Sequence, residues 1–315
     1  MKLLFILDPL SSLKAYKDTS LAIMREAAGR GHELYVSMQH DLFLRGNVAR
    51  ISAEKFIFTE QNFSTEQALE YAPADFSAII MRKDPPFDNE YLYSTYLLEI
   101  AANQGAKVYN NPSAIRSWNE KLSVTRFPQF TPEFLVTANN DLIRKFLREH
   151  QDIIVKPLDG MGGSSIFRLG INDPNISVIL ETITNFGTRT IMAQHYLSAI
   201  IQGDKRIIVI DGVPLPYALA RIPKAGETRG NLAAGGTGIA QLLNERDLDI
   251  ANTVGKVLKQ AGLFLVGLDV IGDHLTEINV TSPTGMVEIA EQTNCKPAHI
   301  FINALEETFR NISKS

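Results

Sequence analysis

Cysteine and histidine are scarce in this chain, and long apolar or basic runs are missing. The single cysteine, Cys295, excludes a disulfide within the chain and fits a reducing compartment. The six histidines are scattered and form no HExxH pattern, so they give no support for a zinc site. The N-terminal apolar stretch ends at Asp8 after about five residues, which is too short for a signal peptide or a membrane span. Together with a net charge of −4, these absences predict a cytoplasmic protein with neither a nucleic acid nor a membrane as its partner.

The first third of the chain has the pattern of an open parallel sheet. An apolar strand at residues 2–7 is followed by a helix that begins after Asp18 and by a second strand at residues 33–38. This order of strand, helix and strand is typical of parallel sheets with helices on their faces. A further buried strand is expected at residues 78–81.

The chain is long enough, at 315 residues, for two or three domains. Residues 45–75 show no clear pattern. Pro128 and Pro132 interrupt the next helical segment, which indicates a first domain boundary near this point.

A glycine-rich loop follows the lysine that ends an apolar strand. Lys156 is followed by Gly160, Gly162 and Gly163, and a new strand is expected at residues 165–169. Glycines allow backbone N–H groups to surround an anion, and the lysine adds a positive charge suited to a phosphate oxygen. The loop joins two strands, so it is neither a P-loop nor a Rossmann turn. The segment predicts a flap over phosphates; the alternative is a hairpin turn with a surface lysine.

Two further segments carry positive charge at places where ligands bind. The strand at residues 78–81 leads into Arg82 and Lys83, which would suit a substrate carboxylate at the carboxyl end of a strand; the alternative is a solvated turn. Residues 222–238 are glycine-rich and lack periodicity, and Arg221 and Arg229 accompany them. A segment of this length predicts a lid over an anionic ligand, with a surface loop as the alternative.

An apolar strand is expected at residues 190–197. With Gln194 and free backbone groups at a sheet edge, it is a candidate for binding an adenine ring. An ordinary edge strand is the alternative.

A metal site is predicted on two strands near the C-terminus. Strands at residues 263–271 and 275–280 are expected to pair through a three-residue loop, Gly272–His274. Because side chains alternate, this loop length places Asp269, Glu277 and Asn279 on the face opposite the core. Two carboxylates and an amide oxygen on one face suit Mg²⁺, which also binds nucleotide phosphates. The alternative is a polar face exposed to solvent.

Read together, these motifs resemble the ATP-grasp superfamily and, within it, the prokaryotic glutathione synthetases. The segments that carry the resemblance are Met81–Asp88, Lys156–Ser165, Ala218–Gly236 and Leu275–Thr284, and the similarity covers essentially the whole chain. It implies an α/β and α+β fold in which ATP lies between two lobes. The implied domains are an N-terminal open parallel sheet at residues 1–120, a small lobe with the glycine flap at 121–200, and a C-terminal lobe with the lid and metal site at 201–315.

The resemblance implies ATP-dependent ligation of γ-glutamylcysteine to glycine, giving glutathione, ADP and phosphate through an acyl phosphate. By position, it assigns ATP to Lys121, Lys156, Gly160, Gly162, Gly163, Gln194, Tyr196, Leu197 and Asn279. It assigns Mg²⁺, or Mn²⁺ in its place, to Asp269, Glu277 and Asn279. It implies that Arg206, Arg221 and Arg229 stabilise charge at the acyl phosphate. It assigns substrate contacts to Arg229, Ser282 and Thr284, in addition to Arg82 and Lys83.

Two rivals remain at this point. One is another ATP-grasp ligase, resembling D-alanine–D-alanine ligase or joining an amino acid to a peptide. The other is a module that binds ATP without catalysis, against which the complete metal face and the two arginines of the lid argue. The family also implies a homotetramer.

Overall fold

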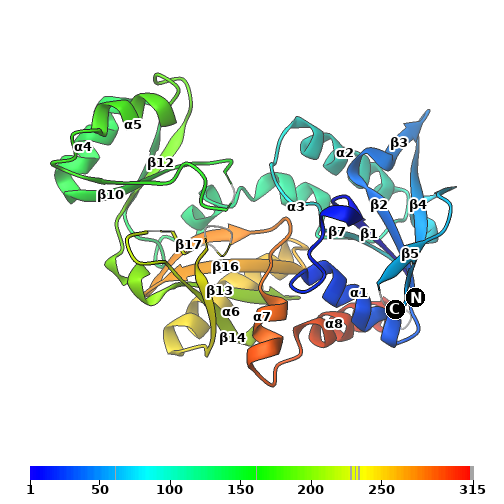
Figure 1. The fold of residues 1–315 in the computed structure, drawn as a ribbon. Coiled ribbons are helices and arrows are strands. Elements are labelled where there is room, and N and C mark those ends of the chain that lie inside the picture. The colour runs from blue at the N-terminus through cyan, green and yellow to red at the C-terminus, as the bar shows by residue number, and fades with distance from the viewer. Residues whose placement is uncertain (61, 161, 228, 231, 233–234, 313–315) are drawn as a thin grey trace.

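The computed structural model describes residues 1–60, 62–160, 162–227, 229–230, 232 and 235–312, which form three sheets with helices packed around them (Figure 1). The first sheet has the strand order β3-β4-β2-β1-β7-β8, with β5 and β6 paired to β4. Its centre is parallel, as predicted, whereas β4 runs antiparallel to β2. The segment without a clear sequence pattern therefore adds antiparallel hairpins. The strands are β1 (Lys2–Leu7), β2 (Glu33–Met38), β3 (Leu42–Arg45), β4 (Val48–Phe58), β5 (Phe63–Thr65), β6 (Leu69–Tyr71), β7 (Ala78–Met81) and β8 (Val108–Tyr109).

Helices with well-defined N-caps cover this sheet. The carboxylates of Asp18 and Asp88 accept hydrogen bonds from backbone N–H groups in the first turns of α1 and α2, which satisfies donors that a helix start leaves unpaired. The helices are α1 (Thr19–Gly29), α2 (Asn89–Asn103) and α3 (Pro112–Ser117). Short 3₁₀ helices along the whole chain cover Leu10–Ser12, Gln39–Asp41, Pro73–Asp75, Leu122–Arg126 and Ser198–Gln202.

The second sheet is a small antiparallel lobe with its own core. Its order is β11-β10-β12-β9, and α4 and α5 pack on it. The predicted edge position of the strand at residues 190–197 is wrong, because β9 and β10 pair with both sides of β12. The elements are β9 (Phe134–Thr137), α4 (Asn140–His150), β10 (Asp152–Pro157), β11 (Phe167–Gly170), α5 (Ile176–Ile183) and β12 (Ile191–His195).

The third sheet is antiparallel and has the order β15-β14-β13-β16-β17. Asp211 and Gly212 both have positive φ, 49° and 80°, and make the tight turn between β13 and β14, for which an Asp-Gly pair is well suited. The elements are β13 (Asp204–Ile210), β14 (Val213–Ile222), β15 (Thr237–Leu242), α6 (Glu245–Gln260), β16 (Leu265–Ile271), β17 (His274–Asn279), α7 (Met286–Gln292) and α8 (Pro297–Ile312).

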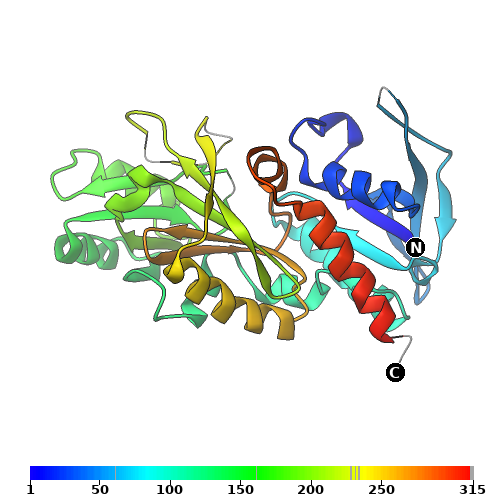
Figure 2. The ribbon, with the colours of Figure 1, turned by 90° about the horizontal axis from the view of Figure 1, so that it is seen from below.

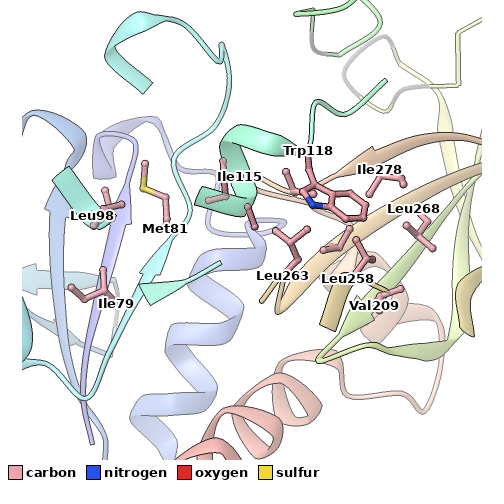
Figure 3. Packing of buried hydrophobic residues seen from close by; sticks show 14 of the residues in the cluster. Ile79, Met81, Leu98, Ile115, Trp118, Val209, Leu258, Leu263, Leu268 and Ile278 are labelled. Carbon is pink, nitrogen blue, oxygen red and sulfur yellow. The ribbon is translucent and has the colours of Figure 1, made fainter. Parts of the chain in front are cut away.

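One hydrophobic cluster joins the first and third sheets. Figure 3 shows Trp118 and Ile115 between Met81 of the first sheet and Leu263 and Leu268 of the C-terminal part, and all five are buried. Among the described residues, β9–β12, α4 and α5 contribute none of the buried residues of this cluster. The N-terminal and C-terminal parts therefore form one base, against which the small lobe is a separate unit.

The last helix returns to the N-terminal part. Helix α8 lies beside α1 (Figure 2), where Arg30 Nη1 donates to Asn303 Oδ1 at 2.7 Å and His32 Nε2 lies 2.9 Å from Glu306 Oε1. The division of the chain at residues 120 and 200 stays a prediction. None of the helices in the described ranges has the length and apolar character needed to cross a membrane.

Candidate active site

A cavity of about 660 Å³ lies where the three sheets meet. Most of the predicted site residues line it. These are Lys121, Lys156, Gly160, Gly162, Gly163, Gln194, Tyr196, Leu197, Arg206, Arg221, Arg229, Glu277, Asn279, Ser282 and Thr284. Asp269 lies directly behind the lining and contacts two of its arginines. The fold thus places predicted site residues around one cavity, although they lie up to about 160 positions apart in the chain, from Lys121 to Thr284.

Two lysines approach one carboxylate at the base of the cavity. Lys121 Nζ and Lys156 Nζ lie 3.8 and 3.7 Å from Glu277 Oε1, and Lys121 also donates to the carbonyl oxygen of Gly160 at 2.9 Å. Burial lowers the pKa of Lys156, although Glu277 opposes the change. Burial also disfavours the charge of Lys121, but Glu277 and Glu120 outweigh it and raise its pKa. Both lysines therefore lie near the Glu277 carboxylate, and Lys121 also links this group to the glycine loop.

Asp269 and Glu277 lie on the same face of the sheet, as predicted, but the turn between their strands is shorter than predicted. Strand β17 begins at His274, so a two-residue turn, not three residues, connects the strands. A bulge at Thr276 restores the register and puts Asp269 opposite Glu277, and Asn279 opposite Gly267. The Thr276 hydroxyl donates to the carbonyl oxygen of Asp269 at 3.1 Å and holds the bulge in place.

Asp269 is the centre of a buried ion-pair network. Arg206 donates to its two oxygens at 2.5 and 3.0 Å, and Arg221 Nη2 lies 2.8 Å from Oδ2. Burial alone would raise the pKa of this carboxyl, but the two guanidinium groups hold it well below its usual range. Asp269 is therefore ionised, and Arg206 and Arg221 are held along the cavity wall.

Two acids in this network were not predicted from the sequence. Asp204 is 2.5 Å from Arg221 Nη2, and its Oδ1 is buried without a partner among the described residues. Burial raises the pKa of Asp204 to about 7; Arg221 opposes this rise, and the charges of Asp269 and Glu277 add to it. Burial, together with Glu277, also raises the pKa of Glu120 to about 7. The alternation Asp204, Arg206 along β13 is the sequence signal that marks Asp204 as a neighbour of Arg206.

The raised pKa of Asp204 predicts that the ligand-free protein loses stability as the pH rises. The folded-state pKa of about 7 exceeds the ordinary value of 3.8, so the folded state binds this proton more tightly than the unfolded state does. The contribution is fully present below about pH 4 and is lost as the pH rises through about 7. Urea unfolding across this range should give a shallower fall in the free energy of unfolding for Asp204→Asn. Equal slopes in both proteins would contradict the assignment.

The donor set on β16 and β17 fits a hard divalent cation. Asn279 Nδ2 donates to the carbonyl oxygen of Gly267 at 3.3 Å, which leaves its Oδ1 available beside Glu277. Over the described ranges, no group of three or more His, Cys, Asp and Glu side chains is placed to hold a metal. A cation here would thus use Asp269, Glu277 and the amide, with phosphates completing its ligands.

The end of the cavity near β12 suits a nucleotide base. Gln194 is 4 % exposed, and its Nε2 has no partner within the described part of the chain. Ile154, Tyr196 and Leu197 line the cavity with it. An apolar slot with one unsatisfied amide donor favours a flat heteroaromatic ligand over an apolar one.

Arg82 and Lys83 do not line the cavity. Arg82 is buried, and it donates to Ser20 Oγ and to the carbonyl oxygen of Pro283, both at 3.0 Å. Lys83 Nζ lies 2.8 Å from Asp8 Oδ1. These contacts tie the end of β7 to α1, to the β1 end and to the loop after β17.

The N-terminal wall of the cavity comes from residues that the sequence did not single out. Asp8, Ser12, Lys14, Lys17 and Asp84 belong to this wall, and Glu288 of α7 also lines the cavity. Asp84 accepts a short hydrogen bond from Ser282 Oγ. Part of the predicted lid, residues 228, 231 and 233–234, and Met161 of the flap lie outside the described residues. Within the lid, Arg229 Nη2 pairs with Glu227 Oε2 at 2.6 Å.

Solved structures with the same fold include an ATP-grasp ligase. The structure of D-cycloserine synthetase DcsG covers 97 % of this chain and 99 % of its own with a TM-score of 0.68 and 14 % identity. The ATP-grasp ligase PsnB, solved with a minimal precursor, Mg and ADP, covers 96 % and 98 % with a TM-score of 0.61 and 17 % identity. At these identities the likeness concerns the fold.

Sequence comparisons give the family. Residues 1–116 match the N-terminal domain of prokaryotic glutathione synthetase, and residues 120–294 match its ATP-grasp domain. The glutathione synthetase of Nitrosomonas europaea is 58 % identical over 98 % of both chains, and that of Ralstonia nicotianae is 54 % identical over 97 % of this chain and 95 % of its own. The chain belongs to the prokaryotic glutathione synthetase family of ATP-dependent ligases.

Proposed function

We propose that this protein joins the cysteinyl carboxylate of γ-glutamylcysteine to the amine of glycine, with conversion of ATP to ADP and phosphate. Family membership over the full length supports the reaction. The observation that carries the assignment of the site is the convergence of Lys121, Lys156, Arg206 and Arg221 on the edge formed by Asp269 and Glu277.

A carboxylate oxygen is a poor leaving group, so the reaction needs activation. Transfer of the γ-phosphoryl group to the cysteinyl carboxylate gives an acyl phosphate and ADP. The neutral amine of glycine then attacks the carbonyl carbon, and phosphate leaves with the C–O electron pair. The protein contributes mainly position and charge compensation.

The charged side chains divide this task. Lys121 and Lys156, with the N–H groups of the glycine loop, are placed to bind the ATP phosphates. Arg206 and Arg221 line the cavity and would stabilise the charge where the carboxylate and the γ-phosphate meet, and their pairing with Asp269 limits their reorganisation. Arg229 approaches from the lid, which excludes the water that would hydrolyse the acyl phosphate.

The remaining assignments concern the metal ion, the adenine ring and glycine. Asp269, Glu277 and Asn279 would hold Mg²⁺, or Mn²⁺ in its place, and the ion supplies charge compensation for the phosphates. Gln194, Tyr196 and Leu197 would receive adenine. Ser282 and Thr284, in the loop after β17, would receive glycine. Arg82 and Lys83 act indirectly, because their contacts hold the walls of the cavity.

An omission assay tests the reaction. Phosphate release should require ATP, a divalent cation, γ-glutamylcysteine and glycine together, and the product should have the mass of glutathione. Release that is independent of the dipeptide, or that proceeds with D-alanine alone, would instead support another ATP-grasp ligase. Binding of ATP with no release under any combination would support a non-catalytic module.

We propose further that the enzyme works in the cytoplasm as a homotetramer. The single cysteine fits a reducing compartment. Sedimentation of the purified protein tests the assembly, and a monomer at working concentration would contradict it.

A further inference from the structure

The link between the small lobe and the C-terminal part passes through the base-binding end of the cavity. Strand β12 ends at His195, and β13 begins at Asp204. Tyr196 and Leu197 are the first residues of the connection, and both line the cavity. The connection between the two parts therefore includes residues that would receive the base.

Arg168, on strand β11, contacts Tyr196 of this connection. Its guanidinium carbon lies 3.7 Å from the centre of the Tyr196 ring. Its Nε lies 3.0 and 3.1 Å from the two carboxylate oxygens of Asp152, and its Nη2 lies 2.5 Å from Oδ2. The backbone carbonyl of Asp152 in turn accepts a hydrogen bond from the Tyr196 N–H at 3.1 Å. Asp152 thus holds the backbone of Tyr196 directly and its ring through Arg168.

The strand register puts this cluster on the face that carries the cavity. Arg168 pairs with Ile154 across β10 and β11, and Ile154 pairs with Gln194 across β10 and β12. Directly paired residues share a face of the sheet, and both Ile154 and Gln194 line the cavity. Arg168 stands at the outer rim of that face, since β11 is the edge strand, and it does not itself line the cavity.

Ordinary surface electrostatics do not account for this arrangement. The side chain of Arg168 is 43 % exposed and that of Asp152 is 31 % exposed, so the ion pair alone would contribute little to stability. A planar guanidinium fixed by a carboxylate fork and stacked on a ring has a defined direction, which an isolated surface pair lacks. The hydrogen bond to Asp152 also raises the pKa of Arg168, so its charge is kept.

We propose that Arg168 is a positioning residue for nucleotide binding: with Asp152 it holds Tyr196 against the small lobe and keeps residues 194–197 in the conformation that receives a purine base. The ligand class is a purine nucleotide, and the inference rests on the proposed function only in taking ATP as that nucleotide. The cluster acts on binding of the base and leaves the phosphates and the carboxylate untouched.

Calorimetric titration with ATP and kinetics with varied ATP test the proposal. Replacing Arg168 with alanine should weaken ATP binding and raise the KM for ATP by about five- to tenfold, the loss expected for a partly exposed cation–π contact. The kcat at saturating ATP, and the KM values for glycine and γ-glutamylcysteine, should stay within about twofold of the unchanged protein. Arg168→Lys keeps the charge without the planar fork and should behave like the alanine variant.

Matched variants separate positioning from general damage. Tyr196→Leu removes the ring on which Arg168 stacks and should reproduce the loss. In the Arg168→Ala, Tyr196→Leu double variant the losses should not add, because each change removes the same contact. Arg144→Ala is the control: this exposed arginine of the same lobe bonds Ser177 and does not line the cavity.

The outcomes decide the proposal independently of the ligation reaction. Unchanged ATP affinity in Arg168→Ala, or equal loss in Arg144→Ala, would overturn it. Additive losses in the double variant would overturn it too. If the unchanged protein bound ATP but made no glutathione, the proposed function would fail while this test would still give its answer.

Discussion

Replacing Asp269 with asparagine should lower the free energy of unfolding by about 3–5 kcal/mol and abolish ligation. Asp269 is 2 % exposed and compensates Arg206 and Arg221, which are 8 % and 5 % exposed. Asparagine is nearly the same size, so packing changes little, but two buried guanidinium groups lose their shared counter-charge. The proposed metal site loses a carboxylate in the same step.

A second variant separates the stability effect from the catalytic effect. Glu277 is paired more loosely, at 3.7–3.8 Å from two lysines, and its side chain is 19 % exposed. Glu277→Gln should therefore lose turnover while the free energy of unfolding changes by about 1 kcal/mol or less. Urea unfolding and an assay of phosphate release measure both. Asp269→Asn with normal stability would contradict the structural role of the network.

Replacing Lys156 with methionine should reduce kcat by about 100- to 1,000-fold, the usual cost of losing a group that stabilises charge in a transition state. The Lys156 ammonium is buried 3.7 Å from Glu277 Oε1, and Lys156 lines the cavity together with the glycines of the loop. Methionine keeps most of the volume, so the core of the small lobe should stay packed.

The matched control is Lys145→Met. Lys145 lies on α4 of the same lobe, is 68 % exposed and pairs only loosely with Glu149 at 3.9 Å. Its loss should leave kcat unchanged. Steady-state kinetics with thermal unfolding of both variants would expose a general folding defect. A Lys156→Met enzyme with near-normal kcat would show that the phosphates bind elsewhere.

Much of the fold follows from local pattern. Residues 3–7 and 78–81 are uninterrupted apolar runs, as expected for strands buried on both faces, and Asp18 caps its helix where the sequence places it. The order of strands within a sheet has no local signal in the sequence. The prediction of an edge position for β12 is wrong for this reason: β12 lies between β10 and β9. Within the stretch that lacks a clear pattern, β4 pairs antiparallel with β2, β5 and β6, and these pairings depend on residues distant in sequence.

In the site, too, residues that belong to local motifs are predictable from the sequence, and residues that depend on burial or packing are not. Lys156, the glycines and the carboxylates of β16 and β17 stand in motifs whose chemistry is visible in sequence. The bulge at Thr276 was invisible, because a two-residue turn alone would have turned Asp269 away from Glu277. Asp204 and Glu120 escaped notice because their importance comes from burial, which raises the pKa of each to about 7. Arg82 has the right charge near the site, but packing directs it to Ser20 and Pro283.

Oxygen labelling tests the central step, activation of the carboxylate as an acyl phosphate. The cysteinyl carboxylate of γ-glutamylcysteine is labelled with ¹⁸O, and the released phosphate is analysed by mass spectrometry after turnover with ATP and glycine. Transfer of the γ-phosphoryl group to this carboxylate predicts one ¹⁸O in each phosphate molecule and one remaining in the peptide bond. Unlabelled phosphate, with the displaced ¹⁸O released to water, would contradict it.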